Sequence, residues 1–395
     1  MRILIANANH ALAGGAETYI RELIPGLRER GHKVGVLVEK FAPSGQPTLD
    51  REGGVPIWEL TTQDRSAVAK ELSSWSPDVC FLHGLYDTLQ QEWLAETFPT
   101  VLFAHNHHGT CISGTKRFAF PGEEVCHRRF GLGCLALYLP RRCGGLNPLA
   151  MIRGYQGQAA RLRLLSKYRA MVVSSRYMVD EYRRHGVPSE KLHRLPLFPT
   201  DSNPDHDPPA DRPIMGELLV IARLTETKGV HHAIAALRPA ASRLGRHLRL
   251  TVAGEGPERE RLEEMSRRLK ADVRFVGWVG GDERNRLIRS ADLLILPSTC
   301  PESFGLIGPE AGCVGLPTAA FTVGGVPDWL TPGVSGELAP ANPATPDGLV
   351  DAIVRALRSP DHWASLRRGA WETAKRFTRS AHLDGLETLF QAVAK

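Results

Sequence analysis

Short apolar runs rich in Val, Ile and Leu alternate along the chain with longer stretches whose apolar positions recur at helical spacing. This alternation predicts βαβ units and parallel sheets, because parallel strands need a helical crossover between them. In the first half, strands are expected over 2–6, 33–38, 78–82, 101–104 and 170–173. In the second half, they are expected over 217–221, 249–253, 273–276, 292–296 and 318–321.

The stretches between these runs predict helices over 16–30, 177–185, 230–237, 258–269 and 282–290. The first should end at Gly31, and Pro25 is expected to kink it. Residues 196–214 hold six prolines without periodicity and are interpreted as a linker. It would join an N-terminal domain (1–195) to a C-terminal domain (215–375), and a last helix within 376–395 is expected to pack back on the first domain. The predicted fold class is α/β, with two Rossmann-like domains facing each other across a cleft that binds the ligand.

Composition excludes several other classes. The 395 residues are 42% hydrophobic and 23% charged, which is ordinary for a soluble protein and excludes collagen-like and low-complexity chains. No run approaches 18 apolar residues, so a membrane-spanning helix is not expected. The first apolar run turns polar at Asn7, too early for a signal peptide, and is interpreted as a strand. We therefore expect a cytoplasmic protein, in which disulfides are rare.

The positive charge is concentrated in one block. Residues 111–191 hold 15 Lys and Arg against 5 Asp and Glu, whereas the whole chain has a net charge of only +6. Such a block indicates an anionic partner, which could be a membrane surface, a phosphorylated lipid or a nucleic acid. The alternative is an ordinary solvated surface that binds no partner.

Three motifs carry candidate chemistry, and each also has a purely structural interpretation. Gly14 and Gly15 follow the first strand and open a helix, where backbone N–H groups can approach a phosphate. Arg223 and Lys228 lie between a strand and a helix, where two cations could clamp a diphosphate; a solvated turn is the alternative.

The third motif runs from Pro301 to Glu310 and places two carboxylates, Glu302 and Glu310, after a strand. If Phe304 onward is helical, the helix N-terminus could hold a phosphate and Glu310 would lie two turns along. Carboxylates accept hydrogen bonds from the hydroxyls of a sugar or a ribose. Taken alone, such a pair of acids is more often exposed surface.

Together these motifs resemble the retaining nucleotide-sugar glycosyltransferases of family 4, which have the GT-B fold. The resemblance covers nearly the whole chain and is strongest over 218–340. The matching segments are 222–229, 253–257, 276–278, 291–292, the run from Glu302 to Glu310, 324–328 and 334–338.

The resemblance implies a role for each motif. Arg223 and Lys228 would bind the donor diphosphate, and Gly14 and Gly15 would close on it from the other domain. Glu310 would bind the ribose hydroxyls. Glu302 would hold the transferred sugar and its phosphate, together with the backbone of Ser303, Phe304, Gly305 and Leu306. The backbone of Val276, Gly277 and Trp278 would contact the base.

In the first half, His105 matches the strand-end His of the family and would contact the transferred sugar near the acceptor. Asn106 stands where many relatives have Asp, Ala222 stands where Gly is usual, and 197–201 lacks the usual Asn-Gly-x-Asp. These departures leave the donor base and sugar open, with UDP expected over GDP.

The expected reaction moves a sugar from a nucleoside diphosphate to an acceptor hydroxyl with retention of configuration. No Asp-x-Asp signature stands in the expected place, so no catalytic metal or other catalytic cofactor is expected. The acceptor is expected to be a glycan or a lipid-linked glycan in surface polysaccharide or glycolipid assembly, with docking on the inner face of the membrane and no nucleic-acid partner. The alternatives are a nucleotide-sugar epimerase and a non-catalytic module that binds anionic lipid or glycan.

Four cysteines within 33 residues form a separate feature: Cys111, Cys126, Cys134 and Cys143. The segment 111–145 is long and irregular, so it is either functional or stapled. Four thiolates suit a structural zinc or an iron–sulfur cluster, although the spacing lacks the tight C-x2-C knuckle. Some family relatives have a Cys six residues after the strand-end His and more Cys downstream. Buried or free thiols and disulfides are the alternatives.

Overall fold

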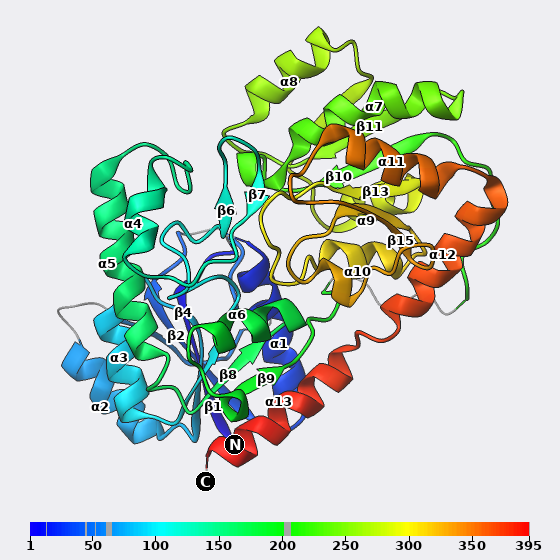
Figure 1. The fold of residues 1–395 in the computed structure, drawn as a ribbon. Coiled ribbons are helices and arrows are strands. Elements are labelled where there is room, and N and C mark those ends of the chain that lie inside the picture. The colour runs from blue at the N-terminus through cyan, green and yellow to red at the C-terminus, as the bar shows by residue number, and fades with distance from the viewer. Residues whose placement is uncertain (13, 44–45, 52, 61–64, 201–206, 395) are drawn as a thin grey trace.

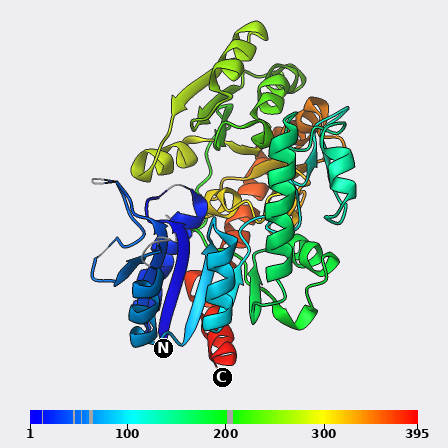
Figure 2. The ribbon, with the colours of Figure 1, turned by 90° about the vertical axis from the view of Figure 1, so that its left-hand side faces the viewer.

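The computed structural model describes residues 1–12, 14–43, 46–51, 53–60, 65–200 and 207–394. Two α/β domains lie one above the other in Figure 1, and a turned view shows the same two lobes (Figure 2). Residues 201–206, within the predicted linker, lie outside the described residues. Among the described residues, no helix combines the length and the apolar character needed to cross a membrane.

The N-terminal domain is built on a seven-stranded parallel sheet with the order β3-β2-β1-β4-β5-β8-β9. Its strands are β1 (Arg2–Asn9), β2 (Lys33–Lys40), β3 (Ile57–Glu59), β4 (Val79–Gly84), β5 (Thr100–Phe103), β8 (Ala170–Val173) and β9 (Leu192–Arg194). Its helices are α1 (Gly15–Glu29), α2 (Arg65–Trp75), α3 (Thr88–Thr97), α4 (Gly133–Tyr138), α5 (Pro148–Leu164) and α6 (Arg176–Arg184). A small antiparallel hairpin of β6 (Arg117–Phe118) and β7 (Glu124–Val125) stands apart from the sheet.

The C-terminal domain repeats this plan on a six-stranded parallel sheet with the order β12-β11-β10-β13-β14-β15. Its strands are β10 (Glu217–Ile221), β11 (Arg249–Ala253), β12 (Val273–Gly277), β13 (Leu293–Leu296), β14 (Thr318–Phe321) and β15 (Gly336–Ala339). Its helices are α7 (Val230–Leu244), α8 (Arg259–Arg268), α9 (Gly281–Ser290), α10 (Ile307–Gly312), α11 (Pro346–Leu357) and α12 (Pro360–Ala374).

The strands predicted from the sequence pattern are all present, whereas β3, β9 and β15 were not among them. These three strands are only three or four residues long and lie at the edges of their sheets, where a short run carries little hydrophobic signal. The helix predicted over 230–237 continues to Leu244 through Pro239. The segment 111–145 contains a hairpin and a short helix that its sequence did not indicate.

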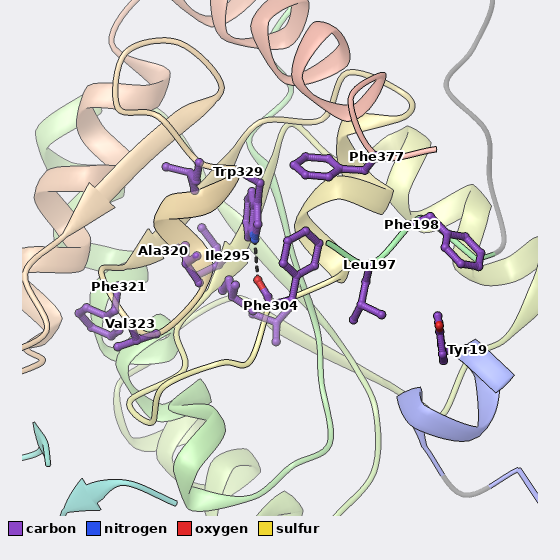
Figure 3. Close-up of a cluster of buried hydrophobic side chains, with 14 of the residues drawn as sticks. Tyr19, Leu197, Phe198, Ile295, Phe304, Ala320, Phe321, Val323, Trp329 and Phe377 are labelled. Carbon is purple, nitrogen blue, oxygen red and sulfur yellow. Dashed lines mark hydrogen bonds between the residues drawn. The ribbon is translucent and has the colours of Figure 1, made fainter. Parts of the chain in front are cut away.

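The prediction that a helix begins at Phe304 is wrong. Helix α10 begins at Ile307, and Phe304 is fully buried in the core. Figure 3 shows its ring among the apolar side chains, with its carbonyl oxygen accepting a hydrogen bond from Nε1 of Trp329 at 2.6 Å. Burial of this ring and the left-handed backbone of Gly305 (φ +78°) delay the helix by three residues. Glu310 therefore lies in the first turn of α10 and not two turns along.

The last helix, α13 (Arg379–Val393), lies against α1 and β5 of the N-terminal domain. His382 accepts a hydrogen bond from the Tyr19 hydroxyl at 2.6 Å and donates from its other ring nitrogen to the Pro196 carbonyl at 2.8 Å. Arg30 forms ion pairs with Asp384 and Glu387. The chain termini consequently lie close together in both views (Figures 1 and 2).

Both sheets reverse their strand order at the first strand of the domain. β1 pairs with β2 and β4, and β10 pairs with β11 and β13, all in parallel. Ligands of open α/β sheets bind outside the carboxyl ends of the strands at such a switch point. This topology places the loop after β1 and the loop after β10 at the candidate site.

Candidate functional site

A cleft of about 760 Å³ lies between the two domains, at the carboxyl ends of both sheets. The N-terminal domain contributes Leu12, Gly14, Gly15 and Thr18, and Thr200 comes from the predicted linker. The C-terminal domain contributes the loops after β10, β11 and β12 and the start of α10, through Arg223, Glu255, Trp278, Arg284, Leu306, Ile307 and Glu310 among others. The volume is in the range of small-molecule sites.

Arg223 follows β10 and lines this cleft with an exposed side chain. In the part of the chain that the structure describes, no carboxylate pairs with its guanidinium. Gly14 and Gly15 line the same cleft from the opposite domain at the start of α1, where the helix dipole favours negative charge. The two loops together form a cationic surface suited to a phosphate.

Glu310 is the buried carboxylate of the cleft, with 5% of its surface exposed. Thr200 donates its hydroxyl hydrogen to Oε1 of Glu310 at 3.0 Å, and Arg284 forms an ion pair with Oε2. Each carboxylate oxygen has two lone pairs, so Glu310 can still accept from ligand hydroxyls. Arg284 lines the cleft but was not predicted as a site residue. A charged side chain in the first helical turn after Gly280 and Gly281 could have indicated it.

Trp278 exposes 78% of its surface at the cleft, an unusual position for an indole. Its ring packs so closely on Gly280 that a Cβ atom there would lie 2.7 Å from the indole. The ring therefore offers a flat aromatic face on which a planar ligand group can stack.

Lys228 and Glu302 form an ion pair of 2.7 Å between the loop after β10 and the loop after β13. Ser298 also donates its hydroxyl hydrogen to Glu302. Burial alone would lower the pKa of Lys228 and raise that of Glu302, but the opposite charge outweighs burial in both cases. The pKa of Lys228 is raised and that of Glu302 is lowered, so both stay charged at neutral pH.

Two glycines hold these loops at the required distance. A Cβ atom at Gly229, whose φ is +63°, would lie 1.9 Å from the Pro297 carbonyl oxygen. A Cβ atom at Gly324, whose φ is +53°, would lie 2.1 Å from the Glu302 carbonyl oxygen. Any side chain at either position would push apart the backbone that carries the Lys228–Glu302 pair.

His105 lies just after β5, outside the set of cleft-lining residues. Its Nε2 is 2.8 Å from Nδ1 of His83, and its ring packs edge-on against Tyr19. Burial, followed by the nearby His108 and His382, lowers the pKa of His105 to about 3. The imidazole is therefore neutral at physiological pH and can exchange hydrogen bonds with a hydroxyl group.

The structure brings only part of the predicted site together in the cleft. Gly14, Gly15, Trp278, Leu306, Arg223 and Glu310 line it, whereas Val276, Gly277, Ser303, Phe304, Gly305, His105, Lys228 and Glu302 are not among the lining residues. Ser303 instead accepts a hydrogen bond from Ser174 of the N-terminal domain at 3.0 Å. The four predicted cysteine ligands lie in the 111–145 insertion, away from the cleft lining.

We expect Lys228→Met to lower stability by about 1–3 kcal/mol, because it leaves the partly buried Glu302 carboxylate without its cation. In the wild type, the lowered pKa of Glu302 contributes stability above its unfolded pKa, and this contribution is lost as pH falls through the folded value. Without Lys228, burial raises that pKa, so the variant should lose stability as pH rises. Urea unfolding at about pH 5 and about pH 8 measures both trends.

The double variant Lys228→Met/Glu302→Gln is the control for this experiment. It removes both charges and should abolish the inverted pH dependence. A single variant whose stability follows the pH dependence of the wild type would contradict the pairing.

The comparisons with known proteins agree with this architecture. The family model "Glycosyltransferase Family 4" matches residues 13–198, and "Glycosyl transferases group 1" matches residues 208–377. A glycogen synthase of Mycobacterium tuberculosis is 37% identical over 43% of this chain, and an alpha-D-kanosaminyltransferase of Streptomyces kanamyceticus is 29% identical over 54% of it. The matches span 40% and 58% of those relatives, respectively, so the chain covers about half the length of the curated proteins that it matches.

Among solved structures, Anabaena Alr3699/HepE in complex with UDP superposes with a TM-score of 0.70 at 18% identity, covering 99% of this chain and 100% of that one. This likeness shows the fold of two Rossmann-like domains. Together the two family models span nearly the whole chain, one on each domain. The protein belongs to the family 4-type glycosyltransferases and has their GT-B fold.

Proposed function

We propose that the protein transfers a sugar, with retention, from a nucleoside diphosphate donor to an acceptor hydroxyl. The proposal rests on the side chains that line the interdomain cleft. The cleft combines Arg223, which has no carboxylate partner among the described residues, with the buried carboxylate of Glu310 and the exposed indole of Trp278. These three groups match the diphosphate, the ribose hydroxyls and the planar base of one ligand.

The leaving diphosphate gains negative charge as the bond to the anomeric carbon breaks. Arg223 is available to stabilise that charge, and the start of α1 at Gly14 and Gly15 adds a positive dipole from the other domain. Lys228 would contribute once a donor phosphate competes with Glu302 for its ammonium group. Cations and helix termini at these positions do the electrostatic work of a metal, and we propose that catalysis needs none.

Retention is proposed to follow from attack on the face that the diphosphate leaves. Glu302 accepts hydrogen bonds from Lys228 and Ser298. A carboxylate engaged in this way is suited to holding hydroxyl groups of the donor and is poorly suited to act as a nucleophile. The acceptor oxygen bonds to the anomeric carbon, and the acceptor proton passes to the departing phosphate oxygen. The neutral imidazole of His105 would orient a hydroxyl of the transferred sugar.

HepE was solved with UDP, which supports UDP as the nucleotide of the donor. We further propose that the acceptor is a glycan or lipid-linked glycan of surface polysaccharide or glycolipid assembly, met by a cytoplasmic enzyme that docks on the inner face of the membrane. Five exposed apolar side chains gather in α4, α5 and the turns around them: Leu132, Leu139, Leu146, Leu149 and Ile152. They lie within the basic block of residues 111–191, and a segment that combines exposed apolar side chains with cations suits an anionic membrane surface.

The reaction is tested with a panel of UDP- and GDP-hexoses and no acceptor. We expect slow release of UDP from one UDP-sugar, unaffected by EDTA, with the released sugar first appearing as the anomer of the donor in NMR spectra. Release of the opposite anomer would overturn retention. Interconversion of nucleotide sugars would indicate an epimerase, and UDP binding without turnover of any donor would indicate a binding module.

We expect Arg223→Ala to weaken the binding of free UDP about tenfold to a hundredfold, because a hydrogen bond to a charged partner is lost. Isothermal titration with UDP and GDP measures the effect, and UDP should bind more tightly to the wild type. Arg286→Ala is the matched control, since Arg286 is an exposed arginine of α9 paired with Glu283 and outside the cleft lining. Equal losses in both variants would mean that Arg223 acts only through net charge.

Membrane docking predicts that the protein co-sediments with vesicles that contain anionic lipid and is released as salt concentration rises. Leu146→Ser/Leu149→Ser should reduce binding at low salt without changing UDP affinity, because both side chains are exposed and far along the chain from the cleft residues. Neutral vesicles provide the comparison. No sedimentation with anionic vesicles at low salt would show that the patch does not bind membranes.

A further inference from the structure

The insertion over 111–145 is fixed to the N-terminal domain by buried polar contacts. Nζ of Lys116 pairs with Oε1 of Glu181, on α6, at 2.5 Å, and both side chains are almost completely buried. The Phe130 N–H donates to Nε2 of His185 at 2.9 Å. A buried ion pair is costly unless its geometry is kept, so this part of the insertion has a defined position.

The same insertion also reaches the C-terminal domain. The Ala344 N–H donates to the Glu123 carbonyl at 3.0 Å, and the Val125 N–H donates to Oδ1 of Asn342 at 2.9 Å. The Glu123 carboxylate meets His231 and His232 at the start of α7. Figure 1 shows the β6–β7 hairpin beside the C-terminal domain near α7. The insertion is therefore a strap that joins the two domains.

Three of the four cysteines of the strap are tied to one short stretch of backbone, residues 113–116. Sγ of Cys111 accepts the Lys116 N–H at 3.3 Å and lies 3.5 Å from Oγ of Ser113. The Cys126 N–H donates to the Lys116 carbonyl at 2.7 Å. The Thr115 hydroxyl donates to the Cys143 carbonyl at 3.2 Å. Segments that are 15 and 17 residues apart in sequence thus converge on the same few residues.

The fourth cysteine joins them through a small apolar cluster. Cys134 and Cys143 pack together against Ile112, Phe130 and Tyr138. Ile112 directly follows Cys111, so the backbone segments that carry the four cysteines meet in one region between the two anchors of the strap. All four are free thiols.

The surroundings of these thiols suit metal ligands. Cys111 is buried, whereas Cys126, Cys134 and Cys143 are partly buried, and none of the four forms a disulfide. Sγ of Cys111 already accepts a backbone N–H group, a contact that also stabilises a metal-bound thiolate. Convergent thiols that are shielded from solvent can bind a metal, because metal binding deprotonates a thiol outright.

We propose that Cys111, Cys126, Cys134 and Cys143 bind a metal centre, and that this centre is an iron–sulfur cluster with four irons. The spacing of the sulfurs favours a cluster over a zinc site. Zn–S bonds of about 2.3 Å place the four sulfurs of a zinc site about 3.8 Å apart. Across the residues that the structure describes, no three of these sulfurs lie within 4.8 Å of one another. A cluster holds its cysteines farther apart, because iron and sulfide atoms fill the space between them.

The centre would act on the strap and not on the chemistry. It would cross-link strap segments that otherwise hold together by a small apolar cluster and a few hydrogen bonds. The strap reaches the C-terminal domain through Glu123 and Val125, which are not among the residues that line the cleft. Loss of the centre should therefore loosen this contact between the two domains and leave the cleft lining in place.

The test is the metal content of the full-length protein, purified anaerobically from cells supplied with iron. We expect about four irons and four sulfides per chain, and a visible absorbance that bleaches on reduction. Cys126→Ser and Cys134→Ser should each lose the iron and the absorbance, and trypsin should cut their 111–145 segment faster. UDP affinity should change little, which separates this proposal from that of the donor site.

Two control variants locate the metal. Cys80→Ala removes a thiol buried in β4 of the same domain, and it should keep the iron. His231→Ala/His232→Ala removes ligands from the other convergent group, Glu123 with the two histidines, whose ligand atoms lie within 4.8 Å of one another. Arg117 already pairs with Glu123 there, and the N-terminus of α7 disfavours a cation, so these variants should also keep the iron.

Other outcomes overturn the proposal in part or whole. One zinc per chain, lost in the cysteine variants, would support a four-thiolate site but overturn the iron assignment. Metal that follows the histidine variants would place the centre elsewhere. If the cysteine variants are insoluble, the wild-type protein is tested alone by anaerobic reconstitution with ferrous iron and sulfide. Protein that stays free of metal and whose four thiols in 111–145 can all be alkylated would overturn the site. A protein mass that shows two disulfides would also overturn it.

Discussion

The site depends on how the two sheets are held with their carboxyl ends facing each other. Each domain by itself presents only part of the cleft lining, most of which comes from the C-terminal domain. The Tyr19–His382–Pro196 hydrogen-bond chain joins α1, α13 and the first residue of the linker. Around it, an apolar core continues from Tyr19 through Leu197 and Phe198 to Phe304 (Figure 3). The relative position of Gly14 and Arg223 therefore rests on packing that lies outside the cleft.

Electrostatics divides the cations of the site into two kinds. Arg223 is exposed and keeps its full charge for an incoming anion, whereas Lys228 is already matched by Glu302. A neutralised pair costs less to bury than a lone ammonium group, so the protein can place a cation beside a desolvated loop. Glu310 is balanced in the same way by Arg284. The cleft is thus polar and charged without carrying an isolated buried charge.

A second connection between the domains runs through the 111–145 strap and through Asp328. The Asp328 carboxylate accepts the Arg176 N–H at the start of α6 and pairs with the side chains of Arg176 and Arg194. Asp328 belongs to the segment whose Gly324 sets the backbone of Glu302. The contact between the domains and the geometry of the Lys228–Glu302 pair are therefore coupled through a few residues of the C-terminal domain.

The two parallel-sheet domains and the positions of the loops that carry Gly14 and Arg223 could be predicted from the amino-acid sequence. Buried parallel strands such as 170–173 and 217–221 are nearly continuous apolar runs, a pattern that is local and can be seen without the fold. The motifs around Arg223 and Glu310 were also predicted, because loops after such strands meet at one sheet edge.

Which of these residues share the cleft could not be predicted in this way, because it depends on contacts between segments far apart in the chain. Edge strands β3 and β9 and the start of α10 depend on pairing and on burial of Phe304, which a local pattern does not record. Arg284 and the pairing of Lys228 with Glu302 depend on loops far apart in sequence. The four cysteines could be recognised as a group in the sequence. Their convergence in space depends on the contacts of the strap with both domains, because sequence spacing fixes the length of each segment but not its path through the fold.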